Sequence, residues 1–155
     1  MRGSAWIRSG VVTVAALITL AACGGAGGGT GTALVKTATA TVQGRSETVL
    51  TDPSGMTLYY YTRDKDRSVT CLGGCEALWP PVPLSGATMA PNAPSGVSGT
   101  FGADPIASGE LVLTYNDWPL YTYHGDTSPG EDNGEGIVGE WFVATPSLAA
   151  TPSGQ

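Results

Sequence analysis

After residue 36 the chain consists of short runs in which polar and apolar residues alternate, separated by segments rich in Gly, Pro, Asn and Asp. Alternation with a period of two is typical of strands that bury one face. Asp52-Pro53-Ser54-Gly55 matches a type I turn, and Asn116-Asp117 stands at a two-residue hairpin position. We expect a short helical turn between Cys71 and Trp79 and no long amphipathic helix. We expect strands at 37–42, 47–51, 56–62, 97–101, 110–115, 119–124 and 139–144, and therefore a mostly β fold.

The chain contains an internal repeat with an offset of 62 residues. Leu58–Asp64 returns as Leu120–Asp126, and self-similarity at a fixed offset indicates a duplicated structural unit. The offset also aligns Trp79 with Trp141 and Leu50 with Val112. We therefore expect a single small domain made of two degenerate β-hairpin or meander repeats, at about 37–83 and 97–146.

Each copy of the motif carries two tyrosines separated by one residue. Because side chains alternate across a strand, Tyr59 and Tyr61 share one face, as do Tyr121 and Tyr123. We interpret each pair as a packing stripe, since cross-strand aromatic pairs contribute about 0.2–1 kcal/mol each.

Each copy of the motif ends in an aspartate, Asp64 in the first and Asp126 in the second. The aspartate stands at the exit of the expected strand, where a carboxylate can accept backbone N–H groups of the following turn. The whole motif therefore has a structural explanation, in which the tyrosines pack and the aspartates hold turns.

The N-terminal 22 residues have the features of an export signal. Arg2 and Arg8 form a positive region, and the apolar run 11–20 that follows is too short to span a bilayer, which needs about 20 residues. The junction Leu20-Ala21-Ala22-Cys23 resembles a bacterial lipobox. This resemblance implies cleavage before Cys23, diacylglycerol and further acyl chains such as palmitate at that residue, and a protein anchored stably to the membrane.

The charge of the mature chain narrows the class of partner. The full chain has 7 Lys+Arg and 13 Asp+Glu, and the signal removes two arginines and no acid, so the mature charge is 5 − 13 = −8. A net acidic chain without a Lys/Arg cluster argues against nucleic acid and against electrostatic docking on anionic lipid. The remaining expected partners are the membrane, through the lipid, and cell-wall or other envelope components.

Cys71 and Cys75 are the strongest chemical candidates, because a cysteine pair in an oxidising exported compartment is usually a disulfide. Closing this five-residue loop would contribute about 2 kcal/mol. The alternative is a redox-active dithiol or a Cu(I) site, for which His124 is a weak further ligand. His124 is the chain's single histidine and no catalytic signature accompanies it, so we expect no catalytic residues and no enzyme.

In its two tyrosine–aspartate motifs the chain resembles the bacterial secreted-repeat lipoproteins, a family that carries a Y-x-[FWY]-x-x-D motif. Both motif copies match, as do the stretch 71–81 with its cysteines and Trp79 and the hairpin 115–121, so the resemblance covers about residues 45 to 145. It implies an exported and often lipid-anchored protein and supplies no established biochemical activity.

Together these features predict a lipid-anchored envelope lipoprotein on the extracytoplasmic face, acting as a non-enzymatic binding or scaffold module without a cofactor. The sequence does not identify its ligand. The functional alternative for the aromatic motif is an exposed platform for a glycan or another ring ligand, with Tyr60 or Trp118 as candidates. The alternative is a copper-handling or thiol-redox and electron-transfer protein that uses Cys71 and Cys75. The expected order is a lipoprotein signal peptide at 1–22, lipidated Cys23 with a Gly-rich linker at 23–36, the β-repeat domain at 37–146 and a disordered tail at 147–155.

Overall fold

The computed structural model describes residues 34–64, 67–84 and 91–151, which all lie in the second of two units, Gly31–Gln155. The expected signal peptide at 1–22, the lipidation residue Cys23 and the linker as far as residue 33 lie outside the described residues. Within the described ranges, no helix is long and apolar enough to cross a membrane.

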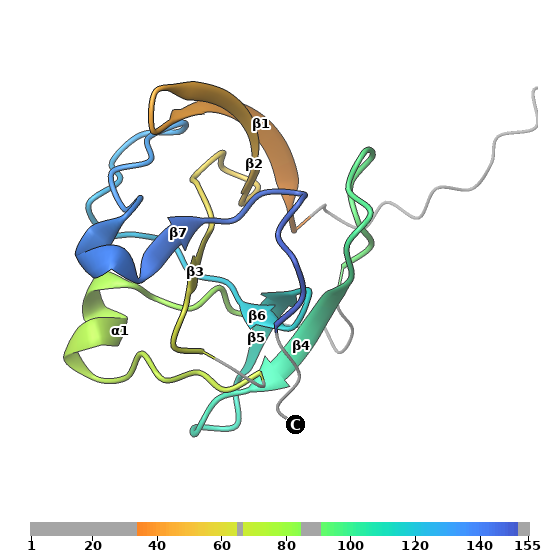
Figure 1. Ribbon diagram of the computed structural model, residues 1–155. Helices are drawn as coiled ribbons and strands as arrows, with labels where there is room; N and C mark the ends of the chain where they lie inside the picture. The colour runs from red at the N-terminus through yellow and green to blue at the C-terminus, as the bar shows by residue number, and fades with distance from the viewer. Residues whose placement is uncertain (1–33, 65–66, 85–90, 152–155) are drawn as a thin grey trace, which may run out of the picture. The chain divides into compact units, whose positions relative to one another are not determined.

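The strands form three small antiparallel sheets with the orders β1-β2, β3-β7 and β4-β5-β6 (Figure 1). The bounds are β1 Lys36–Val42, β2 Arg45–Thr51, β3 Tyr59–Tyr61, α1 Gly74–Leu78, β4 Phe101–Pro105, β5 Leu111–Tyr115, β6 Trp118–Pro119, the 3-10 helix η1 Ile137–Gly139 and β7 Trp141–Val143. The predicted mostly β fold with a short helix near the cysteine pair is confirmed.

The strands expected at 97–101 and 119–124 are exceptions, because β4 begins at the last residue of the first and β6 ends at the first residue of the second. Just before β4, Gly99 N–H donates to the Tyr115 hydroxyl (3.1 Å) and Thr100 N–H donates to Asn116 Oδ1 (2.8 Å). These backbone donors bond side chains instead of a neighbouring strand, so the ladder starts later than the alternation predicts.

Two tight turns set the register of the hairpins. Gln43 and Gly44 join β1 to β2 with φ of +49° and +78°, and Asn116 and Asp117 join β5 to β6 with φ of +49° and +68°. Positive φ at both central positions is typical of the type I′ turn, whose twist matches that of the flanking strands. The hairpin expected at Asn116-Asp117 is therefore confirmed.

The two repeats are interlocked by an exchange of strands. β3 of the first repeat pairs with β7 of the second, with Tyr60 opposite Phe142 (Figure 1). In the other direction, Thr122 N–H of the second repeat donates to the Pro80 carbonyl of the first (3.1 Å). The two-repeat organisation is confirmed, and each repeat completes its sheet with a segment of the other.

Backbone hydrogen bonds correct the alignment of the repeats by one residue around Leu50. Leu50 N–H donates to the Ala144 carbonyl, and Leu113 N–H donates to the Val82 carbonyl, both at 2.8 Å. The counterpart of Leu50 is therefore Leu113 and not Val112, the residue expected from an offset of 62. The connection that follows is one residue shorter in the second repeat, and this shifts the register.

Alternation along the motif strands sorts their side chains into two buried clusters. The first cluster has the buried members Val35, Leu50, Leu58, Leu84, Val97, Phe101, Leu113, Tyr115, Leu120 and Ala144, and Tyr60 packs against it. The second cluster has the buried members Ala40, Val42, Val49, Tyr59, Cys71, Trp79, Tyr121, Trp141 and Val143. All four motif tyrosines belong to or pack against the second cluster, as their shared faces predict: Tyr59, Tyr61, Tyr121 and Tyr123.

The segment after β7 is held against the β5–β6 hairpin. The side chains of Tyr115, Asn116 and Trp118 donate to the carbonyls of Pro146 (2.8 Å), Leu148 (2.7 Å) and Ala149 (2.9 Å). The disordered tail expected from residue 147 is therefore wrong for 147–151, while 152–155 lie outside the described residues. Sequence composition alone missed these bonds because the tail is anchored through its backbone carbonyls.

The close approach of Gly134 to the second cluster gives a stability prediction. A Cβ at Gly134 would lie 2.7 Å from Trp79 Cη2 and 2.8 Å from Tyr59 Cε1. We expect Gly134→Ala to lower the free energy of unfolding in urea by about 1–3 kcal/mol, because the rings must shift. The control is Gly74→Ala in α1, where a Cβ meets nothing within 4 Å and alanine favours the helix by up to about 1 kcal/mol. Equal stability of the two variants would contradict this packing.

Candidate functional site

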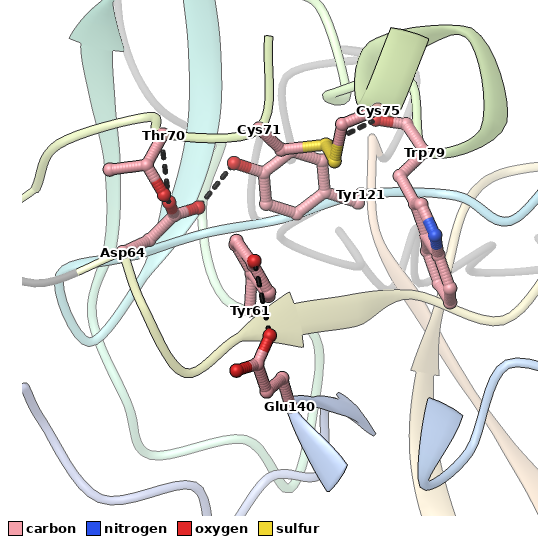
Figure 2. Close-up of a disulfide and its surroundings, with 8 residues drawn as sticks. All are labelled: Tyr61, Asp64, Thr70, Cys71, Cys75, Trp79, Tyr121 and Glu140. Carbon is pink, nitrogen blue, oxygen red and sulfur yellow. Dashed lines mark hydrogen bonds between the residues drawn. A yellow bond between two sulfur atoms is a disulfide. The ribbon is translucent and has the colours of Figure 1, made fainter. Parts of the chain in front are cut away.

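The two copies of the tyrosine–aspartate motif meet directly. Tyr59 N–H donates to the Tyr121 carbonyl and Tyr121 N–H donates to the Tyr59 carbonyl, both at 2.9 Å. Tyr59 Oη donates to Asp126 Oδ2 at 2.6 Å, and Tyr121 Oη donates to Asp64 Oδ2 (Figure 2). The first tyrosine of each repeat therefore binds the aspartate of the other repeat, and we call these two contacts the crossed tyrosine–aspartate pairs.

The second oxygen of each aspartate holds a turn in its own repeat. Asp64 Oδ1 accepts the N–H (2.7 Å) and the hydroxyl (2.6 Å) of Thr70, and Asp126 Oδ1 accepts Asn133 N–H (3.0 Å). The expected role of these carboxylates in holding turns is confirmed for this oxygen. Sequence reasoning missed the crossed partners, because alternation assigns a side chain to a face and does not say which strand it meets.

Burial dominates the electrostatics of the crossed pairs. It raises the pKa of both Asp64 and Asp126, while the hydrogen bonds that each carboxylate accepts act in the opposite direction. Neither aspartate forms an ion pair within the described part of the chain. Burial, together with the partner aspartate, also raises the pKa of Tyr59 and Tyr121. Both phenols are therefore protonated donors at neutral pH.

Cys71 and Cys75 form a disulfide, with their Cα atoms 5.2 Å apart. It joins the buried Cys71 to the half-buried Cys75 of α1 and lies beside Tyr121 and Trp79 (Figure 2). A copper site on this pair would first require reduction of the disulfide. His124 is exposed, and the described residues contain no cluster of three or more His, Cys, Asp or Glu side chains that could hold a metal ion.

A groove of about 240 Å³ lies where the β1–β2 hairpin, β3, β7 and the segment after β7 come together. A second hollow continues it along β2 and shares Glu47 and Thr145 with it. The groove draws on segments of both repeats, so it exists only in the interlocked fold. It is lined by Val42, Gln43, Arg45, Glu47, Tyr60, Glu135, Phe142, Val143, Thr145 and Leu148.

The groove combines aromatic rings with polar groups. The half-buried rings of Tyr60 and Phe142 lie 5.9 Å apart, centroid to centroid. Glu135 accepts Gln43 Nε2–H and Val143 N–H, both at 2.7 Å, and so ties the β1–β2 turn to β7. Burial first, and then the Glu135 charge, raises the pKa of Tyr60.

Of the two platform candidates, only Tyr60 lines the groove. Trp118 is 8% exposed, and its ring lies 5.1 Å from the Tyr60 ring, centroid to centroid. The indole N–H of Trp118 donates to the Ala149 carbonyl. Trp118 therefore packs against Tyr60 and, being buried, offers no platform of its own.

Comparison with known proteins matches the chain to a protein family. A family model described as a secreted repeat of unknown function matches residues 40–83 and 106–145, more than half of the chain. Each matched segment contains one copy of the tyrosine–aspartate motif. No curated protein and no solved structure matches the chain.

The buried aspartates predict how stability depends on pH. The pKa of each is raised above its ordinary value of 3.8, so the folded chain binds their protons more tightly than the unfolded chain. This contribution to the free energy of unfolding is fully present below pH 3.8 and is lost as pH rises through the raised pKa values. It amounts to about 1.4 kcal/mol for each unit by which the pKa in the folded chain exceeds that in the unfolded chain. In urea unfolding measured between pH 4 and pH 8, the free energy of unfolding should fall less steeply with rising pH in Asp64→Asn and in Asp126→Asn than in the unsubstituted protein.

Glu110→Gln serves as the control for this measurement, because it removes an exposed carboxylate that forms no ion pair within the described residues. Its pH dependence should match that of the unmodified protein. A slope that is unchanged in both buried variants would show that neither carboxyl has a raised pKa.

Proposed function

The chain belongs to the family of secreted repeats of unknown function, and from this premise we propose that it is a lipid-anchored, extracytoplasmic binding module. Membership of a secreted family supports an extracytoplasmic location. In this proposal the folded domain binds a ring-containing component of the cell envelope, such as a glycan of the cell wall, and catalyses no reaction.

The observation that carries the proposal is the groove that Tyr60 and Phe142 line together. Binding sites for small ligands are concave, with apolar or aromatic walls and a few placed polar groups. Here Tyr60 and Phe142 supply the rings, while Arg45, Glu47 and Thr145 supply polar groups around them. A half-buried ring whose backing is fixed costs little entropy on binding, so Tyr60 is suited to stack on a sugar or another ring.

The membrane anchor in this proposal is Cys23. The lipobox-like junction Leu20–Cys23 supports acylation there, and ten residues, 24–33, separate Cys23 from residue 34, the first described residue. Two or more acyl chains anchor a protein stably, whereas one chain holds it only marginally. The anchor would keep the domain at the envelope surface, where wall glycans are abundant.

Binding can be measured by cosedimentation of the purified protein with peptidoglycan sacculi. We expect saturable binding that Tyr60→Ala weakens at least tenfold, because the stacking ring is lost. Arg45→Ala should also weaken binding, and because Arg45 is exposed this change tests the groove without disturbing the core. Leu72→Ala is the control, since Leu72 is 52% exposed and lies outside the groove. Binding that is absent, or equal in all four proteins, would contradict the proposal.

The anchor has its own test in cells that export the protein. Cys23→Ser should move the protein from the membrane fraction to the soluble fraction, because serine offers no thiol for the lipid. Without the Cys23→Ser substitution, the mass of the mature protein should exceed that of its bare polypeptide by the mass of a diacylglycerol and its acyl chains. A mass equal to that of the bare polypeptide would contradict lipid anchoring.

A further inference from the structure

Four aromatic rings form a continuous stack through the second cluster. Trp79 and Trp141 lie face to face at the centre, with centroids 3.8 Å apart and planes within 5°. Tyr61 stacks on Trp141 (4.3 Å, 13°) and Tyr123 stacks on Trp79 (4.2 Å, 27°). The tryptophans are only 4% and 3% exposed, whereas both tyrosines are half-buried. The two tyrosines at the ends of the stack are accessible to solvent, and the two tryptophans that connect them are not.

The geometry suits the movement of single electrons. Trp and Tyr are oxidised by one electron more readily than most side chains, and parallel rings in contact allow an electron vacancy to pass between them. Packing alone does not require this order, since aromatic pairs also gain from edge-to-face contacts such as Tyr59 on Trp79 (5.4 Å, 80°).

The two ends of the stack differ in how they can release a proton. Tyr61 Oη donates to Glu140 Oε2 at 3.2 Å, and Arg63 Nε donates to Glu140 Oε1 at 2.7 Å. Figure 2 shows Tyr61 and Glu140 facing each other. Tyr123 Oη donates no hydrogen bond to any described residue. A phenol must lose its proton to become a neutral radical, so Tyr61 is the end with an acceptor in place.

We propose that the stack is a one-electron relay that carries oxidising equivalents from Trp79 and Trp141 to Tyr61. A one-electron oxidant, such as a small inorganic radical, takes an electron from Trp141 and is itself reduced. Tyr61 then returns an electron to Trp141 and passes its proton to Glu140 Oε2, leaving a neutral tyrosyl radical. A small reductant of the ascorbate or thiol class supplies one electron to Tyr61, and Glu140 returns the proton.

Such a relay would protect the buried core. Trp79 lies beside the disulfide, with its carbonyl 3.9 Å from Cys71 Sγ (Figure 2). A radical that persisted on a buried tryptophan could react irreversibly with oxygen, whereas one on half-buried Tyr61 is open to a reductant. This proposal does not rest on ligand binding in the groove.

Time-resolved absorption of the mature protein after photo-oxidation by a ruthenium tris-bipyridine complex and a sacrificial electron acceptor tests the relay. We expect tryptophanyl absorption to decay as tyrosyl absorption rises. Tyr61→Phe keeps the ring and should lower the tyrosyl yield at least tenfold, leaving a longer-lived tryptophanyl radical. Glu140→Gln should slow tyrosyl formation at least tenfold, because an amide remains near the phenol but cannot take its proton at neutral pH.

Two variants serve as controls for the relay. Tyr115→Phe changes a tyrosine that lies outside both the stack and the groove, and it should behave like the unsubstituted protein. Tyr123→Phe should leave most of the tyrosyl yield in place, since no side chain of the described residues is placed to accept the proton of that phenol. A tyrosyl yield in Tyr61→Phe equal to that of the unmodified protein, or no electron transfer between the rings, would overturn the proposal.

Discussion

Two buried carboxylates constrain this fold, and each finds a hydrogen-bond donor in the repeat to which it does not belong. Asp64 receives the Tyr121 hydroxyl and Asp126 receives the Tyr59 hydroxyl. A buried charge that loses a donor is costly, and no cation compensates either aspartate within the described residues. Neither repeat can therefore complete its core alone, and the two must fold as one cooperative unit.

The crossed pairs also determine where the exchanged strands, the aromatic stack and the groove lie. They hold the first tyrosines of the two motifs side by side, which fixes the exchange of β3 and β7 with the segments around them. The exchange brings Trp79 of one repeat onto Trp141 of the other at the centre of the aromatic stack. It also carries β7 and the segment that follows past the β1–β2 hairpin, where they form the groove around Tyr60.

Much of the local structure could be predicted from the sequence, because period, turn chemistry and spacing are local signals. Alternation correctly grouped the motif tyrosines on one face, and Asn116-Asp117 marked a hairpin. The exchange of strands, the one-residue shift at Leu113 and the groove could not be predicted in this way. The first two depend on which distant segment a strand pairs with, and the groove depends also on a polar tail that is anchored by its carbonyls. The periodicity of the sequence contains no signal for either of these contacts.

The most direct test of the crossed pairs is a double-mutant cycle in urea unfolding with Tyr59→Phe and Asp126→Asn. The hydroxyl and the carboxylate bond each other, so the two changes should couple by about 0.5–3 kcal/mol. The cycle of Tyr59→Phe with Asp64→Asn, which lie in one repeat without a bond between their side chains, should be closer to additive. A crossed cycle that is additive, or a larger coupling within the repeat, would contradict the interlocked core.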